Sequence, residues 1–381
     1  MSLHKTASYL VLIVGWFLIG FFVRGLNILP VNSMDAELAL IREAEQVIAI
    51  QSYNPPTSIR ELTYGAIRGL LASIDDDYAE FLDPQTAERV NIESEGKDAI
   101  IGLNGEIRNK QFVVTDVFSD MPAHQAGVLE GDILLEIDDW KVARNTTRLA
   151  VVAMIRGPIN STAHLVVQRN DQILTFDIPR IPAVDINTEV LESNIAYLRL
   201  DRFTTQTGPQ MEEAVKSLLS ENPKAIIWDL RFNGGGSMEA TRQTLDLFLD
   251  DGMAFYARVR DGTLIPYPTA SGGIAENIPL VVLIGPHTYS APETAAAAIR
   301  DRGRGILIGE STYGKDSIIT SINLSDGSSI RFTVARWLSP VSQQTYEGEG
   351  VPADIIVPSD PTPGEDPALQ AAILYIKEQL P

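Results

Sequence analysis

The strongest constraint on the fold comes from residues 183–381, where short and continuously apolar runs alternate with helical segments. The runs include KAIIWDL (224–230) and PLVVLIG (279–285), and sequences such as MEEAVKSLLSE (211–221) stand between them. Strands that are apolar on both faces must be covered on both faces, which parallel strands joined by helices achieve. We therefore predict an α/β core, a sheet covered by helices, over residues 183–381.

Residues 94–182, which precede this core, have a different sequence pattern. Short β-type runs such as QFVVTDVF (111–118) and AHLVVQRN (163–170) alternate with turn residues, and one helical stretch lies near Arg148 to Ile155. This spacing of short strands predicts a small, mostly β domain.

The first 30 residues form a third kind of segment. Residues 7–23 (ASYLVLIVGWFLIGFFV) carry no charge and are largely apolar, which is near the lower limit for a helix that crosses a bilayer. A cleaved secretory signal is the alternative, but no small-x-small cleavage site follows the apolar run. We favour an uncleaved membrane anchor. In either case the remainder is exported, to a periplasmic, extracellular or lumenal side.

Residues 31–93 are predicted to be mainly helical. Met34 to Gln51 has apolar residues at helical spacing, and Ser58 with Glu61 forms a capping-box pattern that opens a second helix. An acidic cluster at 75–77 lacks the glycine and distal glutamate of a calcium loop, so we interpret it as a solvated turn.

Self-association is a further expectation. The amphipathic segment Met34 to Gln51 and the terminal helix 367–380 each offer an apolar face. Either face could pack on its own chain or on a second copy, so the sequence leaves a homo-oligomer open.

Charge and composition exclude several functions. The chain has 50 acidic and 30 basic residues, and a net charge of −20 repels phosphate backbones, so we expect no nucleic-acid partner. The absence of cysteine rules out disulfides, a thiolate nucleophile and cysteine-ligated metal. No HExxH or phosphate-binding loop motif is present, so we expect neither a metal nor another cofactor.

Ser290 is the candidate nucleophile. It follows an apolar strand and opens an alanine-rich helix, where the amide of Ala291 can donate to an oxyanion. Serine is also a common N-cap, so the position alone does not establish catalysis. None of the four histidines is well placed as its base, but Lys315 stands alone beside a glycine downstream, and a desolvated lysine can act as a general base.

Several ordered motifs resemble one known family. TYSAPET (288–294) is similar to the family segment T-A-S-A-S-E, and GESTYGKDS (309–317) is similar to G-E-K-T-F-G-K-G-S. Further matches are GAIRGLLASIDDDYAEFLDP (65–84), IAYLRLDRF (195–203), WDLRFNGGG (228–236) and GEGVPADIIV (348–357). The chain thus resembles the carboxyl-terminal processing peptidases, or tail-specific proteases, which are serine-lysine endopeptidases with a PDZ domain. The resemblance covers nearly everything after residue 30.

The resemblance implies roles for individual residues. Ser290 would be the nucleophile and Lys315 the general base. The amide of Ala291 and an amide from Gly235 or Gly236 would form the oxyanion hole, because consecutive glycines let bare backbone approach an intermediate.

One position departs from the family pattern. The family has a glutamine four residues beyond the lysine that helps to orient the amine, and this chain has Ile319 there. An aliphatic side chain cannot hydrogen-bond the amine, although it can increase desolvation and favour the neutral form.

The segment MPAHQAGVLEGDILLEIDDWKV (121–142) resembles a PDZ domain. Such domains add an extended tail to a strand edge and bind its terminal carboxylate with backbone N–H groups. Gly102, Leu103, Asn104 and Gly105 occupy the expected carboxylate-binding place.

Two functions follow from these observations. The first is a membrane-anchored, extracytoplasmic serine endopeptidase that recognises and cleaves the C-terminal tails of proteins by a Ser-Lys mechanism. The second is a catalytically impaired relative that binds tails, or a membrane-protein complex, as a scaffold. Ile319 favours the second function, and the retained pair Ser290 and Lys315 favours the first.

Overall fold

The computed structural model describes residues 31–54, 58–144, 146–358 and 366–379, and it divides into two units, Met1–Ile74 and Asp75–Pro381. The predicted membrane anchor, residues 7–23, lies outside the described residues. Of the helices in the described part of the chain, none combines the length and the apolar character needed to span a bilayer.

The first unit contains two helices, α2 (Val31–Gln51) and α3 (Ile59–Ala72). The predicted cap of α3 is confirmed, because the Ser58 hydroxyl accepts a hydrogen bond from the Glu61 amide at 3.3 Å. Helix α3 has no buried residue, and large apolar side chains of both helices are exposed, such as Ile50 of α2 (81%) and Ile59 of α3 (71%).

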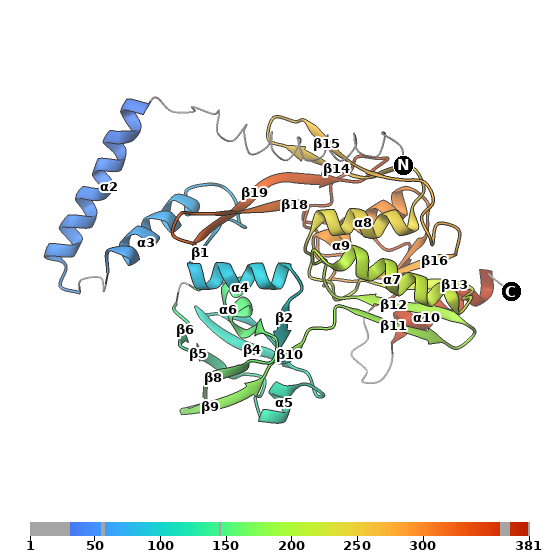
Figure 1. The fold of residues 1–381 in the computed structure, drawn as a ribbon, viewed down its shortest axis with the longest axis horizontal. Helices are drawn as coiled ribbons and strands as arrows, with labels where there is room; N and C mark the ends of the chain where they lie inside the picture. The colour runs from blue at the N-terminus through green and yellow to red at the C-terminus, as the bar shows by residue number, and fades with distance from the viewer. Residues whose placement is uncertain (1–30, 55–57, 145, 359–365, 380–381) are drawn as a thin grey trace, which may run out of the picture. The chain divides into compact units, whose positions relative to one another are not determined.

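The second unit is built around a six-stranded sheet (Figure 1). Its strands follow the order β11 (Ile186–Leu191), β12 (Ile195–Leu200), β13 (Ala225–Asp229), β16 (Leu280–Ile284), β17 (Ile306–Gly309) and β20 (Ile355–Ile356). Strands β12 to β20 pair in parallel, and β11 pairs antiparallel to β12.

Helices cover both faces of this sheet, as Figure 1 shows. On one face, Ile226 and Trp228 of β13 share a core with helices α7 (Thr207–Ser220), α8 (Met238–Phe248) and α9 (Ala291–Asp301). On the other face, Ile227 packs with residues of α10 (Pro367–Gln379). Alternate residues of one strand enter opposite cores because side chains alternate along a strand. The predicted α/β core is confirmed.

A second sheet, whose strands all pair antiparallel, belongs to the same unit. It contains β1 (Glu80–Leu82), β19 (Ser329–Leu338), β14 (Gly252–Val259) and β15 (Leu264–Thr269), and β18 (Ser317–Asn323) also pairs with β19. Helix α4 (Pro84–Ser94) follows β1 and begins at the N-cap Asp83. The segment between β17 and β18 therefore connects the two sheets.

The predicted mostly β region has its own sheet and core. The order is β3 (Leu103–Arg108), β4 (Gln111–Val117), β5 (Ile133–Ile137), β8 (Thr162–Arg169) and β9 (Gln172–Pro179), with β6 (Trp140–Lys141) paired to β5. Two helices, α5 (Pro122–Ala126) and α6 (Arg148–Ile155), and a small sheet of β2 (Asp98–Ile100), β7 (Gly157–Pro158) and β10 (Ile181–Pro182) complete it. Strand β3 stands at an end of the sheet order.

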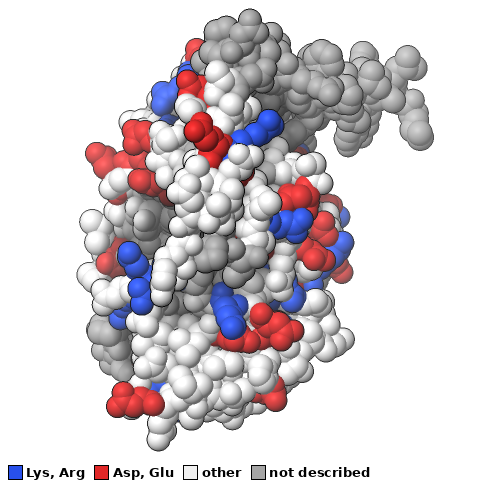
Figure 2. Space-filling model, turned by 90° about the vertical axis from the view of Figure 1, so that its left-hand side faces the viewer, with Lys and Arg blue, Asp and Glu red and all other residues white. Residues whose placement is uncertain are grey.

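Charged side chains are mixed on the face drawn in Figure 2. Acidic groups gather in several places there, and the basic groups among them form no continuous patch. This distribution agrees with the net charge of −20, which disfavours a polyanionic partner.

Candidate active site

Ser290 stands at the turn between β16 and α9, in an unusual backbone conformation with φ 70° and ψ −114°. An ordinary N-cap residue has an extended conformation, and positive φ is unfavourable for a residue with a Cβ. Neighbouring hydrogen bonds fix this turn: the Thr288 hydroxyl donates to the carbonyl of Leu230 at 2.9 Å, and the Tyr289 amide donates to the carbonyl of Asn233 at 3.0 Å. Backbone strain of this kind is found mostly at functional sites.

Lys315 lies in the connection between β17 and β18, and its residue is only 5% exposed. Its amine nitrogen lies 3.9 Å from the centre of the Tyr78 ring and 4.5 Å from the centre of the Tyr289 ring. Burial and, to a smaller extent, the nearby charge of Arg331 lower the pKa of this amine to about 8, against the opposing charges of three carboxylates. A buried amine with such a pKa is a physically reasonable base.

The carboxylate of Glu293 connects the nucleophile turn to the lysine turn. Its Oε2 accepts hydrogen bonds from the amides of Ser290 (2.6 Å) and Lys315 (2.9 Å). Its Oε1 accepts from the Thr312 hydroxyl and the Gly314 amide, both at 2.6 Å. Glu293 is fully buried, which raises its pKa, and the four donors oppose that change. One side chain thus holds both candidate catalytic residues by their backbone.

Glu293 was missed from the sequence. The signal was available, because Ser290 and Glu293 have the S-x-x-E spacing of a capping box. That motif predicts only the bond between the glutamate and the serine amide, and the three donors from residues 312–315 become visible only in the fold.

Of the two glycines expected at the oxyanion hole, Gly235 lies beside Ser290. Gly235 has φ +104°, and a Cβ there would lie 2.9 Å from the Tyr289 carbonyl oxygen and 3.2 Å from the Ser290 Cβ, so this position favours glycine. The Gly235 amide donates to Oδ1 of Asn233 at 2.9 Å. Gly236 pairs with Phe203, and a Cβ there would lie 2.0 Å from the Phe203 carbonyl oxygen. The roles of Gly235, Gly236 and Ala291 stay predictions.

Ion pairs brace the loop that carries these glycines. The guanidinium of Arg231 binds the buried carboxylate of Asp229 and also that of Asp366, and the Tyr197 hydroxyl donates to Asp229 at 2.7 Å. These contacts give Arg231 and Asp229 a structural role at the end of β13.

Ile319 lies on β18 and pairs with Thr333 of β19, next to an irregularity in the register. The amide and hydroxyl of Thr333 donate to the Asp76 carboxylate at 2.7 and 3.0 Å. The interpretation of the acidic cluster as a solvated turn is therefore wrong for Asp76, which is partly buried and bound to β19. Its charge also raises the pKa of Lys315.

The predicted carboxylate-binding residues lie at the free edge of the β-rich domain. Gly102 precedes β3, with φ +83°, and Leu103, Asn104 and Gly105 begin that strand. The guanidinium of Arg148, the first residue of α6, donates to the Gly105 carbonyl (2.9 Å) and to Asn104 Oδ1 (2.7 Å). The binding role of these four residues stays a prediction.

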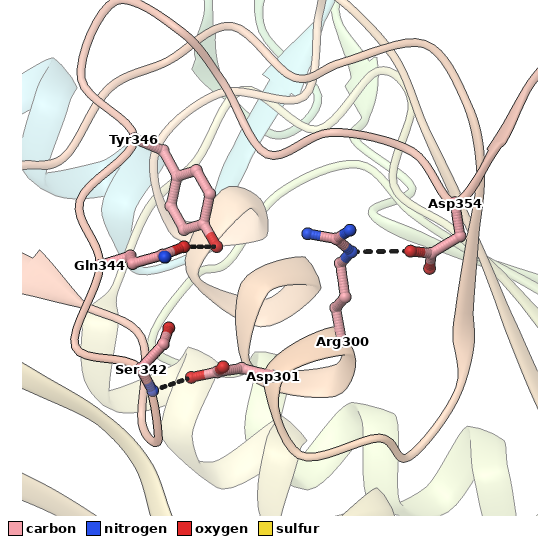
Figure 3. A pocket seen from close by; sticks show the side chains of 6 residues that line it. All are labelled: Arg300, Asp301, Ser342, Gln344, Tyr346 and Asp354. Atoms are coloured by element: carbon pink, nitrogen blue, oxygen red, sulfur yellow. Dashed lines mark hydrogen bonds and ion pairs between the residues drawn. The ribbon is translucent and has the colours of Figure 1, made fainter.

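A separate cavity of about 430 Å³ lies at the other end of α9 (Figure 3). The polar groups that line it are largely paired with one another: Arg300 binds Asp354, and Asp301 accepts from the amides of Val341 and Ser342. Within the described ranges, no group of three or more His, Asp or Glu side chains is arranged to hold a metal ion.

Comparison with known proteins agrees with this geometry. The profile of peptidase family S41 matches residues 194–357, and that of the PDZ domain matches residues 99–179. A carboxy-terminal-processing protease of Bartonella bacilliformis is 30% identical over 309 residues, which are 78% of this chain and 70% of the relative. The chloroplastic carboxyl-terminal-processing peptidase 2 of Arabidopsis thaliana is 31% identical over 75% of this chain and 59% of its own length.

A solved structure shares the architecture. The photosystem II D1 C-terminal processing protease superposes with a TM-score of 0.59 and 26% identity, covering 84% of this chain and 92% of that one. The predicted combination of a protease core and a PDZ domain is therefore confirmed. The chain belongs to peptidase family S41, as a serine-type carboxyl-terminal processing peptidase with a PDZ domain.

Proposed function

We propose that this protein cleaves proteins near their C-terminal tails by a Ser-Lys mechanism, with Ser290 as nucleophile and Lys315 as general base. The observation that carries the proposal is the Glu293 carboxylate, which binds the amides of both residues while the amine of Lys315 is buried. An amine with a pKa of about 8 is neutral in roughly a tenth of the molecules at pH 7, against well under a thousandth for an ordinary lysine.

The proposed reaction uses this neutral amine. Lys315 takes the proton of the Ser290 hydroxyl as the serine oxygen attacks the peptide carbonyl. The oxyanion is stabilised by the Ala291 amide at the start of α9 and by an amide of the glycine loop. The ammonium then gives its proton to the leaving amine, and water releases the acyl group by the same steps in reverse.

The PDZ domain would select the substrate. The free edge of β3 can accept an extended tail as an additional strand, and the backbone at Gly102, Leu103, Asn104 and Gly105 would bind the terminal carboxylate. The substrates are unstructured or partly unfolded proteins with an exposed C-terminus. A net charge of −20 disfavours acidic tails, and salt weakens this effect.

Export and attachment complete the proposal. Residues 7–23 would anchor the protein, with its catalytic part on the periplasmic, extracellular or lumenal side. The exposed apolar residues of α2 and α3 offer a surface for a second copy. The terminal helix α10 is less available, since Ala368, Ala372 and Ile376 are buried in the core of this chain.

The test uses the full chain in detergent with dye-labelled β-casein, an unstructured protein. We expect cleavage by the parent, and none by Ser290→Ala or Lys315→Ala. Lys216→Ala is the matched lysine control, because the Lys216 side chain is 59% exposed and pairs with Glu212 one helical turn away. Equal cleavage by Ser290→Ala and the parent would exclude this mechanism.

A tail-binding scaffold is the second candidate, and Ile319 favours it because the glutamine that would orient the amine is absent. A folded parent that binds a tail peptide by fluorescence anisotropy, and leaves β-casein intact at pH 7 to 9, would support the scaffold.

A further inference from the structure

Two tyrosines enclose the amine of Lys315, and one of them stands where the family pattern has another residue. Tyr289 occupies the position of an alanine in the family segment T-A-S-A-S-E, and Ile319 occupies that of the glutamine. The chain thus departs from the pattern twice around the same amine. The second ring belongs to Tyr78, which follows the acidic cluster.

The geometry is that of a cation-binding pair of rings. The Lys315 nitrogen lies 3.9 Å from the ring centre of Tyr78 and 4.5 Å from that of Tyr289, well inside the 6 Å range of cation–π attraction. The two phenol side chains share a hydrogen bond. Tyr289 also packs edge-on against Tyr313, with ring centres 4.7 Å apart.

Hydrogen bonds hold the backbones of both tyrosines independently of the lysine side chain. The Tyr289 backbone is fixed by the bond from its amide to the Asn233 carbonyl. The Tyr78 amide donates to Oδ1 of Asp76 at 3.0 Å, and the same carboxylate is bound by Thr333, the cross-strand partner of Ile319. Asp76 therefore connects the Tyr78 backbone to the strand pair that carries Ile319.

We propose that the Tyr78–Tyr289 pair positions the amine of Lys315 beside Ser290, in place of the glutamine that Ile319 has replaced. The proposal rests on the Ser-Lys mechanism proposed above and names its missing orienting group. Packing against the two ring faces restrains the long lysine side chain without a hydrogen bond to its nitrogen, so the lone pair of the neutral amine stays free to accept the serine proton. Tyr78 and Tyr289 are positioning residues.

The rings also keep water from the amine. The other charged groups near Lys315 are Arg331, which favours the neutral form, and Glu347, Glu293 and Asp76, which favour the charged form. The substitution Tyr289→Ala removes one of the two rings and admits water, so we expect the pKa of the amine to move from about 8 toward 10.5. Tyr289→Phe keeps the ring over the nitrogen and leaves the pKa near 8.

The experiment is a mutant cycle in the full chain. With dye-labelled β-casein, we expect Tyr289→Ala to lower kcat/KM at pH 7 by about tenfold, the effect of a one-unit rise in the pKa of the base. Tyr289→Phe stays within about twofold of the parent. Adding Ile319→Gln to Tyr289→Ala gives the family's residues at both positions, and we expect it to restore activity. In the parent, Ile319→Gln should change activity little, because the two rings already position the amine. Tyr267→Ala is the control, a partly buried tyrosine that stacks on Phe255.

A second readout separates this proposal from the proposed function. NMR titration of ¹³C-labelled lysine follows the Lys315 amine whether or not the protein cleaves anything. The parent protein could lack peptidase activity while its Lys315 amine titrates near pH 8, with a higher pKa in Tyr289→Ala alone. This result would contradict the Ser-Lys mechanism and support the positioning role of the Tyr78–Tyr289 pair. The positioning role of the Tyr78–Tyr289 pair would be refuted if the pKa of Lys315 were unchanged in Tyr289→Ala. It would also be refuted if Ile319→Gln changed activity equally in the parent and in Tyr289→Ala. If Tyr289→Ala does not fold, Tyr289→Leu and Tyr78→Leu give the same comparison.

Discussion

The buried carboxylate of Glu293 gives the sharpest test of how this site is assembled. All four of its partners are donors: the amides of Ser290, Gly314 and Lys315, and the hydroxyl of Thr312. Only a carboxylate offers acceptors to all four. Substitution of Glu293 therefore leaves buried donors without partners, and their number depends on the new side chain.

Glu293→Gln should lower the free energy of unfolding less than Glu293→Ala. Its NH₂ group must face one pair of donors, and the pair with Thr312 is less costly because a hydroxyl can turn and accept. The Gly314 amide then lacks an acceptor, which costs about 1–3 kcal/mol. Alanine removes the acceptor from three amides, which at the same value for each costs roughly 3–9 kcal/mol. That loss approaches the whole stability of a typical domain, about 5–15 kcal/mol.

The assay is urea unfolding followed by tryptophan fluorescence. Trp337 is a local probe, because its indole N–H donates to the Lys315 carbonyl at 2.9 Å. We expect Glu293→Gln to unfold at a lower urea concentration than the parent and Glu293→Ala to be largely unfolded in buffer. The control Glu212→Gln, which removes an exposed pair with Lys216, changes stability by less than about 0.5 kcal/mol. An unfolding free energy of Glu293→Ala within 1 kcal/mol of the parent would refute the reasoning.

Three other predictions follow from the same region. Activity on β-casein should rise with pH through about 8 and then level off, because burial depresses the pKa of Lys315 and only the neutral amine accepts a proton; a profile flat from pH 6 to 9 would contradict this. In the unfolded chain the Lys315 amine keeps its proton up to about pH 10.5, so folding near pH 7 works against the depressed pKa. Lys315→Met should therefore raise the free energy of unfolding near pH 7 by up to about 3 kcal/mol in chemical denaturation, and this gain over the parent should shrink between pH 8 and 10.5. Gly236→Ala should abolish activity and lower the melting temperature, because its Cβ would meet the Phe203 carbonyl at 2.0 Å, whereas Gly234→Ala, with open space around it, should match the parent in both measurements.

The pattern of apolar, polar and turn residues along the chain was sufficient to predict the main strands and helices. The runs that predict strands at 111–118 and 163–170 correspond to β4 and β8, and the helix expected near Arg148 to Ile155 is α6 with the same bounds. Alternation and turn residues are properties of neighbouring positions, so they can be read from sequence. The same holds for the Ser58 cap, which forms within one helical turn.

The surroundings of the amine were not predictable in this way, because they depend on contacts between distant segments. Asp76 and Thr333 are 257 positions apart, and nothing in DDDY distinguishes a solvated acidic turn from one that binds β19. Tyr289 was visible in the motif only as a departure from alanine. Its ring acquires a role once the fold brings Tyr78 to the other side of Lys315.

These contacts also change the meaning of Ile319. In the sequence alone, the loss of a hydrogen-bonding side chain at this position argues for a weakened peptidase. In the folded protein, the Lys315 amine lies over two tyrosine rings and the Lys315 backbone amide binds Glu293, and neither contact involves position 319. An aliphatic residue there is then compatible with catalysis, since an apolar neighbour favours the neutral form of an amine. The effect of Ile319→Gln in the presence and absence of the Tyr289 ring measures how far one arrangement substitutes for the other.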